Sequence, residues 1–452
     1  MDRQRTVNDD AFEHLRTTVP GARTNALMPA LRRYESHNVT YVDRDTPVFW
    51  ESAQGATVTD VDGNRYIDLT AAFGVANTGH SNARVASAIH DQARRLMHAM
   101  GDVHPTEVKV KLLETLATIA PPGLTKTFLA SSGAEAVEAA LKTAMLATGK
   151  PSFAAFGGAY HGLSFGTLEI AGIEKFRAPF AGALRNRALQ LAYPRATAAL
   201  DEGAAAALDQ TRSALRGRDD LAAVVVEPLQ GRGGCIVPPK GYLAGLRALC
   251  DEMRILLIFD EIYTGFGRTG TMFAAQHEGV VPDILCAGKA MANGFPISAT
   301  IAKPQIMDAW PVARGEALHT STYLGNPMGC AAALANIAEI QRLDLPARAS
   351  RLGLALASRL DALRASGHVT GVRGRGLMWG VELRDGASAE RVVKAALKAG
   401  VIVLQAGPDG NVLSITPPLV ITQRQLFRAI EILADCIEAT PFDRLRITEG
   451  GD

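Results

Sequence analysis

Short apolar runs, separated by stretches with helical periodicity, make up the middle of the chain. The runs occupy residues 126–130, 152–156, 222–228, 255–261 and 283–288. They are short, rich in residues that favour strands and apolar at neighbouring positions, which is typical of strands buried on both faces. Strands of this kind alternating with helices indicate an α/β protein. The pattern therefore predicts a mostly parallel sheet flanked by helices.

The chain before this region has a different pattern. Residues 1–40 show only weak periodicity, and we interpret them as an arm. Two alternating runs flank Asp62 and Gly63 within residues 56–69, which is a good signal for a β-hairpin. We predict an N-terminal arm and hairpin segment over residues 1–95.

The chain after Asn326 leaves the sheet pattern through a long helical stretch, residues 328–343. A smaller mixture of strand-like and helical segments follows and ends in a helix near residues 422–437. We predict a large domain over residues 96–326 and a smaller α+β domain over residues 327–452. The segments behind the second prediction are 369–383, 388–399, 401–404 and 411–416.

Composition narrows the class of protein. The 452 residues carry 47 basic and 46 acidic side chains, a net charge of +1 that predicts no nucleic-acid or membrane-surface partner. The cysteines lack the CxxC spacing of a metal site or redox motif, and their number is odd. The N-terminus lacks the apolar core of a signal peptide, and the apolar runs are too short to span a bilayer. We expect a cytoplasmic, enzyme-sized protein without a metal. The cysteines are Cys235, Cys250, Cys286, Cys330 and Cys436.

A possible phosphate site follows the first of the central runs. Ser131 or Ser132 can cap a helix that begins near Gly133, with Glu135 in its first turn. The exposed N–H groups and positive dipole of such a helix start suit a phosphate. A plain helix cap gives the same sequence pattern.

Acidic and basic side chains follow two later runs. Asp260 and Glu261 end one apolar run, where a carboxylate can pair with a protonated ring nitrogen or simply face solvent. Lys289 follows another run among small and apolar neighbours, which lower the pKa of a lysine and make it nucleophilic. A lysine that extends from a loop into solvent is the alternative.

The segment GFGRTG, residues 265–270, matches the pattern GxGxxG of dinucleotide-binding proteins. Five residues, Asp260 to Thr264, lie between the apolar residues that end at Phe259 and the first glycine, whereas that motif needs a tight strand-to-helix turn. We interpret it as a glycine-rich loop that borders the active site.

These features occur together with further blocks in a familiar order, from about Pro47 to the C-terminus. The chain resembles the class III (omega-type) pyridoxal-phosphate aminotransferases, which have fold type I. This resemblance implies a large domain with a mostly parallel sheet flanked by helices, plus a smaller α+β C-terminal domain. The blocks that carry it are DVDGNRYIDL, SSGAEAVEAALK, GAYHG, VVVEPLQGRGG, IFDEIYTGFGRTG, PDILCAGKA, TSTYLGNP and RGRGLMWGVEL.

The resemblance implies roles for four residues around the cofactor ring. Lys289 is similar to the lysine that binds pyridoxal 5'-phosphate as a Schiff base and moves the substrate proton. Asp260 would keep the ring nitrogen protonated, so that the ring accepts electrons from the substrate. Ile262 would pack on one face of the ring, and Tyr160 would stack on the other.

The resemblance also implies a phosphate cradle and a dimer. Ser132, Gly133 and Ala134 are similar to the family's phosphate-binding turn. Thr322 is similar to a threonine that reaches the phosphate of the neighbouring subunit, which would make the protein a homodimer with shared active sites. We expect His161, beside the stacking tyrosine, to be a packed, hydrogen-bonded residue without a catalytic role.

Two positions depart from the family pattern. Tyr263 replaces a glutamine near the cofactor's phenolic oxygen, and its hydroxyl can form a similar hydrogen bond. Ser414 replaces an arginine that binds the substrate's α-carboxylate, and serine cannot give charged, bidentate recognition. Glu227 is similar to the glutamate that pairs with that arginine. Without the arginine, Glu227 would repel a carboxylate and attract an amine. Arg232 or Arg375 can take over from the arginine if either lies close enough.

The function that the resemblance implies is transamination. We predict ping-pong transfer of an amino group from an amino acid or ω-amine to a 2-oxo acid. The alternative is an amino-acid or amino-lactam racemase or epimerase of the same family. A racemase needs no acceptor, so the loss of the carboxylate-binding arginine at Ser414 is compatible with it.

Overall fold

The computed structural model describes residues 11–41, 43, 45–195 and 202–440. Parts of the predicted arm and C-terminal domain, residues 1–10 and 441–452, lie outside the described residues. The centre is a seven-stranded sheet with the order β4-β10-β9-β8-β7-β5-β6. Its strands are β4 (Lys126–Ala130), β5 (Ser152–Phe156), β6 (Leu189–Leu191), β7 (Leu221–Val226), β8 (Leu256–Asp260), β9 (Ile284–Ala287) and β10 (Ser298–Ala302).

The central sheet is mostly parallel, as the apolar runs predicted. Each pair of neighbours from β9 to β6 is parallel, whereas β10 runs antiparallel to both β4 and β9. The prediction missed β6 and β10. β10 reads Ser-Ala-Thr-Ile-Ala, so its small and polar residues hide a strand that is nevertheless buried at each position.

Helices cover both faces of this sheet. Alternate residues of β7 show the two layers, because Val224 and Val226 pack in one apolar cluster and Ala223 and Val225 in another. The first cluster includes residues of α9, and the second includes residues of α5. The helices before α11 are α3 (Ala83–Arg95), α4 (Glu107–Ile119), α5 (Gly133–Thr148), α6 (Phe165–Ile170), α7 (Glu174–Arg177), α8 (Glu202–Leu215), α9 (Tyr242–Met253) and α10 (Pro304–Met307).

A second sheet joins the two ends of the chain. It has the order β1-β2-β3-β13, from β1 (Trp50–Gln54), β2 (Thr57–Asp60), β3 (Arg65–Asp68) and β13 (Val401–Ile402). β2 and β3 form the predicted hairpin around Asp62 and Gly63, and β13 pairs with β3 in parallel. The arm also contains a helix, α1 (Ala22–Tyr34), which its weak periodicity did not predict.

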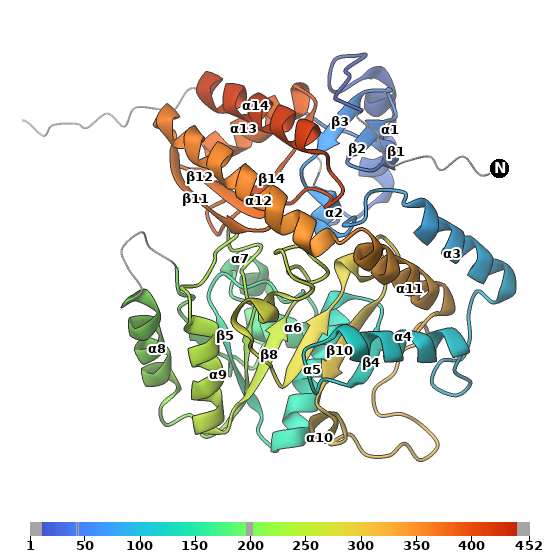
Figure 1. Cartoon of the computed structure of the whole chain (residues 1–452), viewed down its shortest axis with the longest axis vertical. Helices are drawn as coiled ribbons and strands as arrows, with labels where there is room; N and C mark the ends of the chain where they lie inside the picture. Colours follow the sequence, from blue (N-terminus) through green and yellow to red (C-terminus); the bar gives the residue numbers. More distant parts are fainter. Residues whose placement is uncertain (1–10, 42, 44, 196–201, 441–452) are drawn as a thin grey trace, which may run out of the picture.

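The third sheet belongs to the C-terminal part and is antiparallel, with the order β11-β12-β15-β14. In Figure 1 these elements, in orange and red, lie together with the blue N-terminal strands at one end of the molecule. The predicted boundaries at residues 95 and 326 stay predictions. The elements are α11 (Pro327–Arg342), α12 (Leu345–Ala362), β11 (Val369–Arg375), β12 (Met378–Leu383), α13 (Gly386–Lys398), β14 (Leu404–Ala406), β15 (Val412–Ile415) and α14 (Gln423–Ala439). None of the helices in the described part of the chain is long and apolar enough to cross a membrane.

Candidate active site

Polar residues from separate segments meet at one edge of the central sheet. Ser132 follows β4, Tyr160 follows β5, Glu227 follows β7, Asp260 ends β8 and Lys289 follows β9. These strands run in the same direction, so their carboxyl ends lie at the same edge, where open α/β sheets bind ligands.

The start of α5 forms one side of the site. The side chain of Ser132 accepts a hydrogen bond from the Glu135 N–H at 3.3 Å, which makes Ser132 the N-cap residue. The first N–H groups of a helix lack intrahelical acceptors and carry the positive end of its dipole. Gly133 faces the side chain of Ile262, and Gly162 lies directly against Ala134. A larger residue at either glycine would push these segments apart.

His161 contacts the carboxylate of Asp260. Its Nδ1 lies 2.7 Å from Asp260 Oδ2, and both side chains are buried. Asp260 Oδ1 accepts a further hydrogen bond from the Ile262 N–H at 3.0 Å. Burial opposes a charge on His161, but the hydrogen bond to Asp260 and the charges of Asp260 and Glu227 outweigh it and raise the pKa of His161. His161 is packed and hydrogen-bonded as predicted, and its partner is a predicted catalytic residue.

Lys289 lies in a constrained position beside Asp260. Its φ is 40°, a left-handed backbone conformation that is uncommon for residues other than glycine. Its Nζ lies 4.1 Å from the centre of the Tyr263 ring. Burial is the largest influence and lowers the pKa of Lys289, Arg232 acts in the same direction, and Asp260 and Glu227 oppose them. A lysine with a lowered pKa has more of its amine in the nucleophilic, neutral form.

Glu227 is buried, and both of its carboxylate oxygens have partners. Oε1 accepts from the Tyr160 N–H and Oε2 from the Gly231 N–H, each at 3.0 Å. We expected Glu227 to lack the family's arginine partner, and in the described part of the chain two backbone N–H groups satisfy its carboxylate. Burial raises its pKa. The geometry shows a second use of Glu227, since it joins the segment of Tyr160 to the loop after β7.

Tyr263 fills the space between two loops. A side chain at Gly74 would clash with one edge of the Tyr263 ring, and a side chain at Gly231 would clash with the opposite edge. The Tyr263 hydroxyl lies 3.0 Å from Thr416 Oγ1. Ser414, two residues earlier, is buried with its Oγ 3.7 Å from the Sγ of Cys235. The Tyr263 ring and the hydroxyl groups of Thr416 and Ser414 therefore occupy the part of the site between these two loops.

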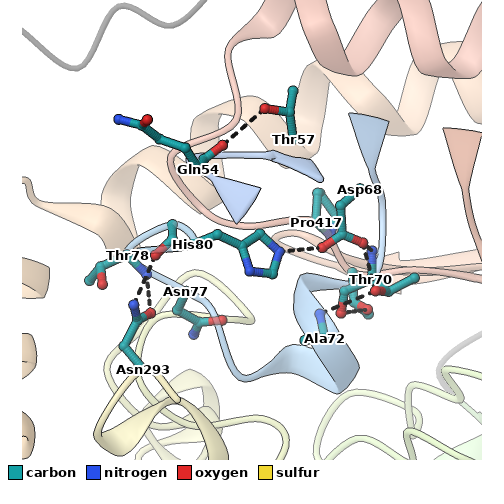
Figure 2. A network of polar contacts seen from close by, with 12 residues as sticks. Gln54, Thr57, Asp68, Thr70, Ala72, Asn77, Thr78, His80, Asn293 and Pro417 are labelled. Atoms are coloured by element: carbon teal, nitrogen blue, oxygen red, sulfur yellow. Dashed lines mark hydrogen bonds and ion pairs between the residues drawn. The ribbon is translucent and has the colours of Figure 1, made fainter. Parts of the chain in front are cut away.

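The loop that carries Gly74 is held by a polar network (Figure 2). Asp68 accepts hydrogen bonds from the N–H and hydroxyl of Thr70 and lies 2.7 Å from His80 Nε2. The short turn α2 (Ala71–Gly74) has Ala71, Ala72 and Phe73 in left-handed conformations. Such strain persists only where surrounding contacts hold the backbone in place. The sequence predicted neither this turn nor its place beside Tyr263.

The candidate arginines lie in different places. Arg232 is exposed beside Phe176, with its guanidinium carbon 6.0 Å from the ring centre, whereas Arg375 lies near His277. Arg268, in the glycine-rich loop, is fully buried and donates to the carbonyls of Leu377 and Pro417 and to Asn77. That loop therefore connects segments of the fold and offers no free cation.

Thr322 is a predicted site residue for which the described part of the chain shows no contact with the others. It is exposed, and among the described residues we find no hydrogen bond between Thr322 and Ser132, Asp260 or Lys289. His161 is the residue whose part in the site was underestimated from the sequence. Its position directly after Tyr160, within the same block, was the available signal.

Comparison with known proteins shows a family match and several similar proteins. It matches the family model described as Aminotransferase class-III over residues 40–437. It is 38% identical over 387 residues to the acetylornithine aminotransferase of Methanosarcina mazei, covering 86% of this chain and 91% of the relative. It is 35% identical over 440 residues to the putrescine aminotransferase of Pectobacterium atrosepticum, covering 96% and 91%. A solved amine transaminase from an uncultivated Pseudomonas species, in its pyridoxal-phosphate-bound form, has a TM-score of 0.83 and 31% identity, covering 90% of this chain and 99% of that chain.

These comparisons confirm several predictions from the sequence. The fold type I architecture, the aminotransferase class and the dependence on pyridoxal phosphate are confirmed. Each of the similar proteins is named an aminotransferase or transaminase, which supports amino transfer and gives no support to the racemase alternative.

Proposed function

Since this chain belongs to the class III aminotransferase family, we propose that Lys289 attaches the pyridoxal phosphate and moves the substrate proton. The observation that carries this proposal is the convergence of Lys289, the Asp260–His161 pair and the start of α5 at one edge of the sheet. The reaction is the transfer of an amino group from an amino acid or ω-amine to a 2-oxo acid in two half-reactions.

The residues at this edge fit the parts of the cofactor. The first-turn N–H groups of α5 at Gly133 and Ala134, with Ser132, suit a phosphate. The carboxylate of Asp260 suits a protonated ring nitrogen, and the low-pKa amine of Lys289 suits an aldehyde. When bound, the cofactor supplies a protonated ring that withdraws electrons from the substrate carbon that loses its proton.

The neighbouring residues hold these groups in place. His161 orients the Asp260 carboxylate through a hydrogen bond to one oxygen, and the Ile262 N–H holds the other. The Ile262 side chain packs between Gly133 and Gly288, so it lies between the start of α5 and the Lys289 loop. We assign Ile262 and Tyr160 to the two faces of the cofactor ring.

We infer a homodimer in which Thr322 completes the phosphate site of the partner subunit. Thr322 is exposed in its own chain, and exposed apolar residues lie on its own segment and on the loop that this segment contacts. Thr320 donates to Asp102, and the ring of Tyr323 lies 5.4 Å from that of His98, which joins the Thr322 segment to the loop between α3 and α4. The exposed apolar residues of this surface are Leu96, Met97, Met100, Val103, Leu318 and Tyr323.

The part of the site around Ser414, Tyr263 and Glu227, which we call the substrate side, limits how a carboxylate can bind. Ser414 faces Cys235, and Glu227 is engaged by backbone N–H groups, so neither of these two residues offers a charged donor for an α-carboxylate. We propose that the donor is an amino acid or an ω-amine whose recognition does not depend on position 414. A cytoplasmic location stays a prediction of the cysteine pattern.

The experiment that tests this function uses the cofactor-loaded protein and a panel of amino acids and ω-amines, without any oxo acid. We would follow the absorbance spectrum and the enantiomer composition together. We expect stoichiometric conversion of the cofactor to its aminated form, reversed by adding one oxo acid. The amine that converts the cofactor is then the donor, and the oxo acid that reverses the conversion is the acceptor.

Catalytic formation of the opposite enantiomer, with the starting spectrum retained, would overturn the transaminase proposal in favour of a racemase. The homodimer is tested separately by light scattering after size-exclusion chromatography. Thr322→Ala should lower the affinity for pyridoxal phosphate while the dimer persists. An unchanged affinity would remove Thr322 from the phosphate site.

A further inference from the structure

We propose that Arg232 binds the carboxylate of the amino-acid or oxo-acid substrate, in place of the arginine that Ser414 replaces. The inference rests on the proposed amino transfer at Lys289 and deepens it by naming how the substrate is held. The cation that binds the carboxylate would then come from the loop after β7, whereas the arginine of the family stands at the position of Ser414 in β15.

The backbone of Arg232 is fixed by its neighbours. Gln230 and Ile236 form a bridge at the base of its loop, with N–O distances of 3.0 and 2.9 Å. The Gly231 N–H donates to Glu227, and the Arg232 carbonyl accepts a hydrogen bond from the Gly407 N–H at 2.9 Å. The side chain is exposed. A rigid loop therefore carries a side chain that is free to meet a ligand, which reduces the cost of ordering it.

The guanidinium lies beside the ring of Phe176, which contacts Tyr160, a predicted site residue. The guanidinium carbon is 6.0 Å from the centre of the Phe176 ring, and Phe176 meets Tyr160 edge-on with ring centres 5.6 Å apart. A guanidinium held over a ring keeps its N–H groups available in its own plane for two hydrogen bonds to a carboxylate. Arg232 is also close enough to Lys289 for its charge to contribute to the lowered pKa there, after the larger effect of burial.

Among the described residues, the Arg232 guanidinium has neither an acidic partner nor a hydrogen-bond acceptor, unlike those of Arg373 and Arg268. Arg373 pairs with Glu382, and Arg268 donates to three buried oxygens. The Nζ of Lys175 lies 5.3 Å from the centre of the Phe176 ring, so a second cation shares this surface. These two positive charges attract an anionic substrate to this surface.

Substrates bound in this way share one chemical feature. They carry a carboxylate near the reacting carbon, as amino acids and 2-oxo acids do. A simple amine or aldehyde lacks the group that Arg232 recognises, so it should bind more weakly to the wild-type enzyme and be indifferent to changes at Arg232.

The test compares two acceptors that differ in the carboxylate. The aminated holoenzyme is mixed with pyruvate or with propanal, and the apparent dissociation constant of each is obtained from the absorbance change. Arg232→Gln should raise the value for pyruvate by about 10- to 100-fold, because a charge-assisted hydrogen bond pair is lost. Its value for propanal should stay within about twofold, since no carboxylate is involved.

Three further measurements keep the test sharp. Arg232→Lys should give an intermediate value for pyruvate, because lysine keeps the charge without the bidentate geometry. Arg375→Gln is the matched control and should behave as the wild type. Binding of propionate, which cannot react, should weaken in Arg232→Gln when it is measured by calorimetry.

The outcomes separate this proposal from the proposed function. Equal weakening of pyruvate and propanal, or no change for either, would overturn the role of Arg232 while amino transfer stands. A wild-type enzyme that loads the cofactor but transfers an amino group to neither acceptor would overturn the proposed function, and the role of Arg232 with it.

Discussion

The two sides of the candidate site are built in different ways. On the cofactor side, Ser132, Asp260 and Lys289 follow strands of one sheet, and His161 fixes Asp260 directly. On the substrate side, segments far apart in sequence meet, and the Tyr263 ring packs between Gly74 and Gly231 beneath Thr416. One side is positioned by sheet topology, and the other by side-chain packing between loops.

The arrangement of the cofactor side follows from the sheet and is general, whereas that of the substrate side depends on the particular side chains of this protein. Parallel strands deliver their carboxyl ends to one edge whatever side chains follow them. Loops that meet through packing depend on each residue at the contact, so a single exchange such as Tyr263 for a smaller residue changes the space itself. We expect substitutions on the cofactor side to abolish chemistry, and those on the substrate side to alter stability and selectivity.

The largest expected effect is that of Lys289→Ala. Without the amine, the chain loses both its covalent attachment and its proton carrier, so turnover should fall by about 10⁴-fold. Borohydride should no longer trap a cofactor adduct, which mass spectrometry would reveal. Lys240→Ala changes an exposed lysine that is not among the predicted site residues, so it is the control and should keep both properties. Full activity in Lys289→Ala would contradict the assignment of the cofactor side.

The sequence predicted the sheet edge that carries the proposed cofactor site. The runs that became β4, β5, β7, β8 and β9 predicted the strands whose carboxyl ends meet there, whereas the roles of Ser132, Asp260 and Lys289 came from the resemblance and stay predictions. The prediction failed where contacts join distant segments. The pairing of His161 with Asp260 spans 99 residues, and that of Tyr263 with Thr416 spans 153. No local periodicity encodes such pairs.

The next effect tests the packing on the substrate side. Gly74→Ala places a methyl group against the Tyr263 ring and puts alanine at a φ of 73°, so we expect it to destabilise the fold by about 2–4 kcal/mol. Gly123→Ala is the matched control, since Gly123 also has a positive φ of 86° but open space around it. It should cost only about 1 kcal/mol. Denaturant unfolding measures both values.

Combining Gly74→Ala with Tyr263→Ala separates the clash from the backbone strain. If the ring causes the clash, the two changes should be non-additive by about 1–3 kcal/mol in the free energy of unfolding. Additive effects would show that the loop carrying Gly74 moves freely, and the contrast between the two sides would then lose its basis.

His161→Phe tests whether the cofactor side depends on the residue behind Asp260. Loss of the hydrogen bond to the Asp260 carboxylate should lower kcat by about 10- to 100-fold and change the pH profile of the cofactor absorbance. His161→Asn, whose amide nitrogen can replace Nδ1, should recover much of the activity. A purely structural role would lower the stability of both variants and leave the pH profile unchanged.

The smallest effect distinguishes the site from an equivalent contact elsewhere. Tyr263→Phe removes the hydroxyl that lies 3.0 Å from Thr416, and Tyr242→Phe removes a hydroxyl that lies 2.9 Å from Thr211 between α8 and α9. Both should cost about 0.5–1.5 kcal/mol in the free energy of unfolding, because each loses one neutral hydrogen bond. Only Tyr263→Phe should also change the KM of the amino donor, because the lost hydroxyl helps to position a side chain beside Lys289, whereas Tyr242 lies between α8 and α9. If both variants change KM alike, or neither does, Tyr263 stabilises the fold without shaping the substrate side.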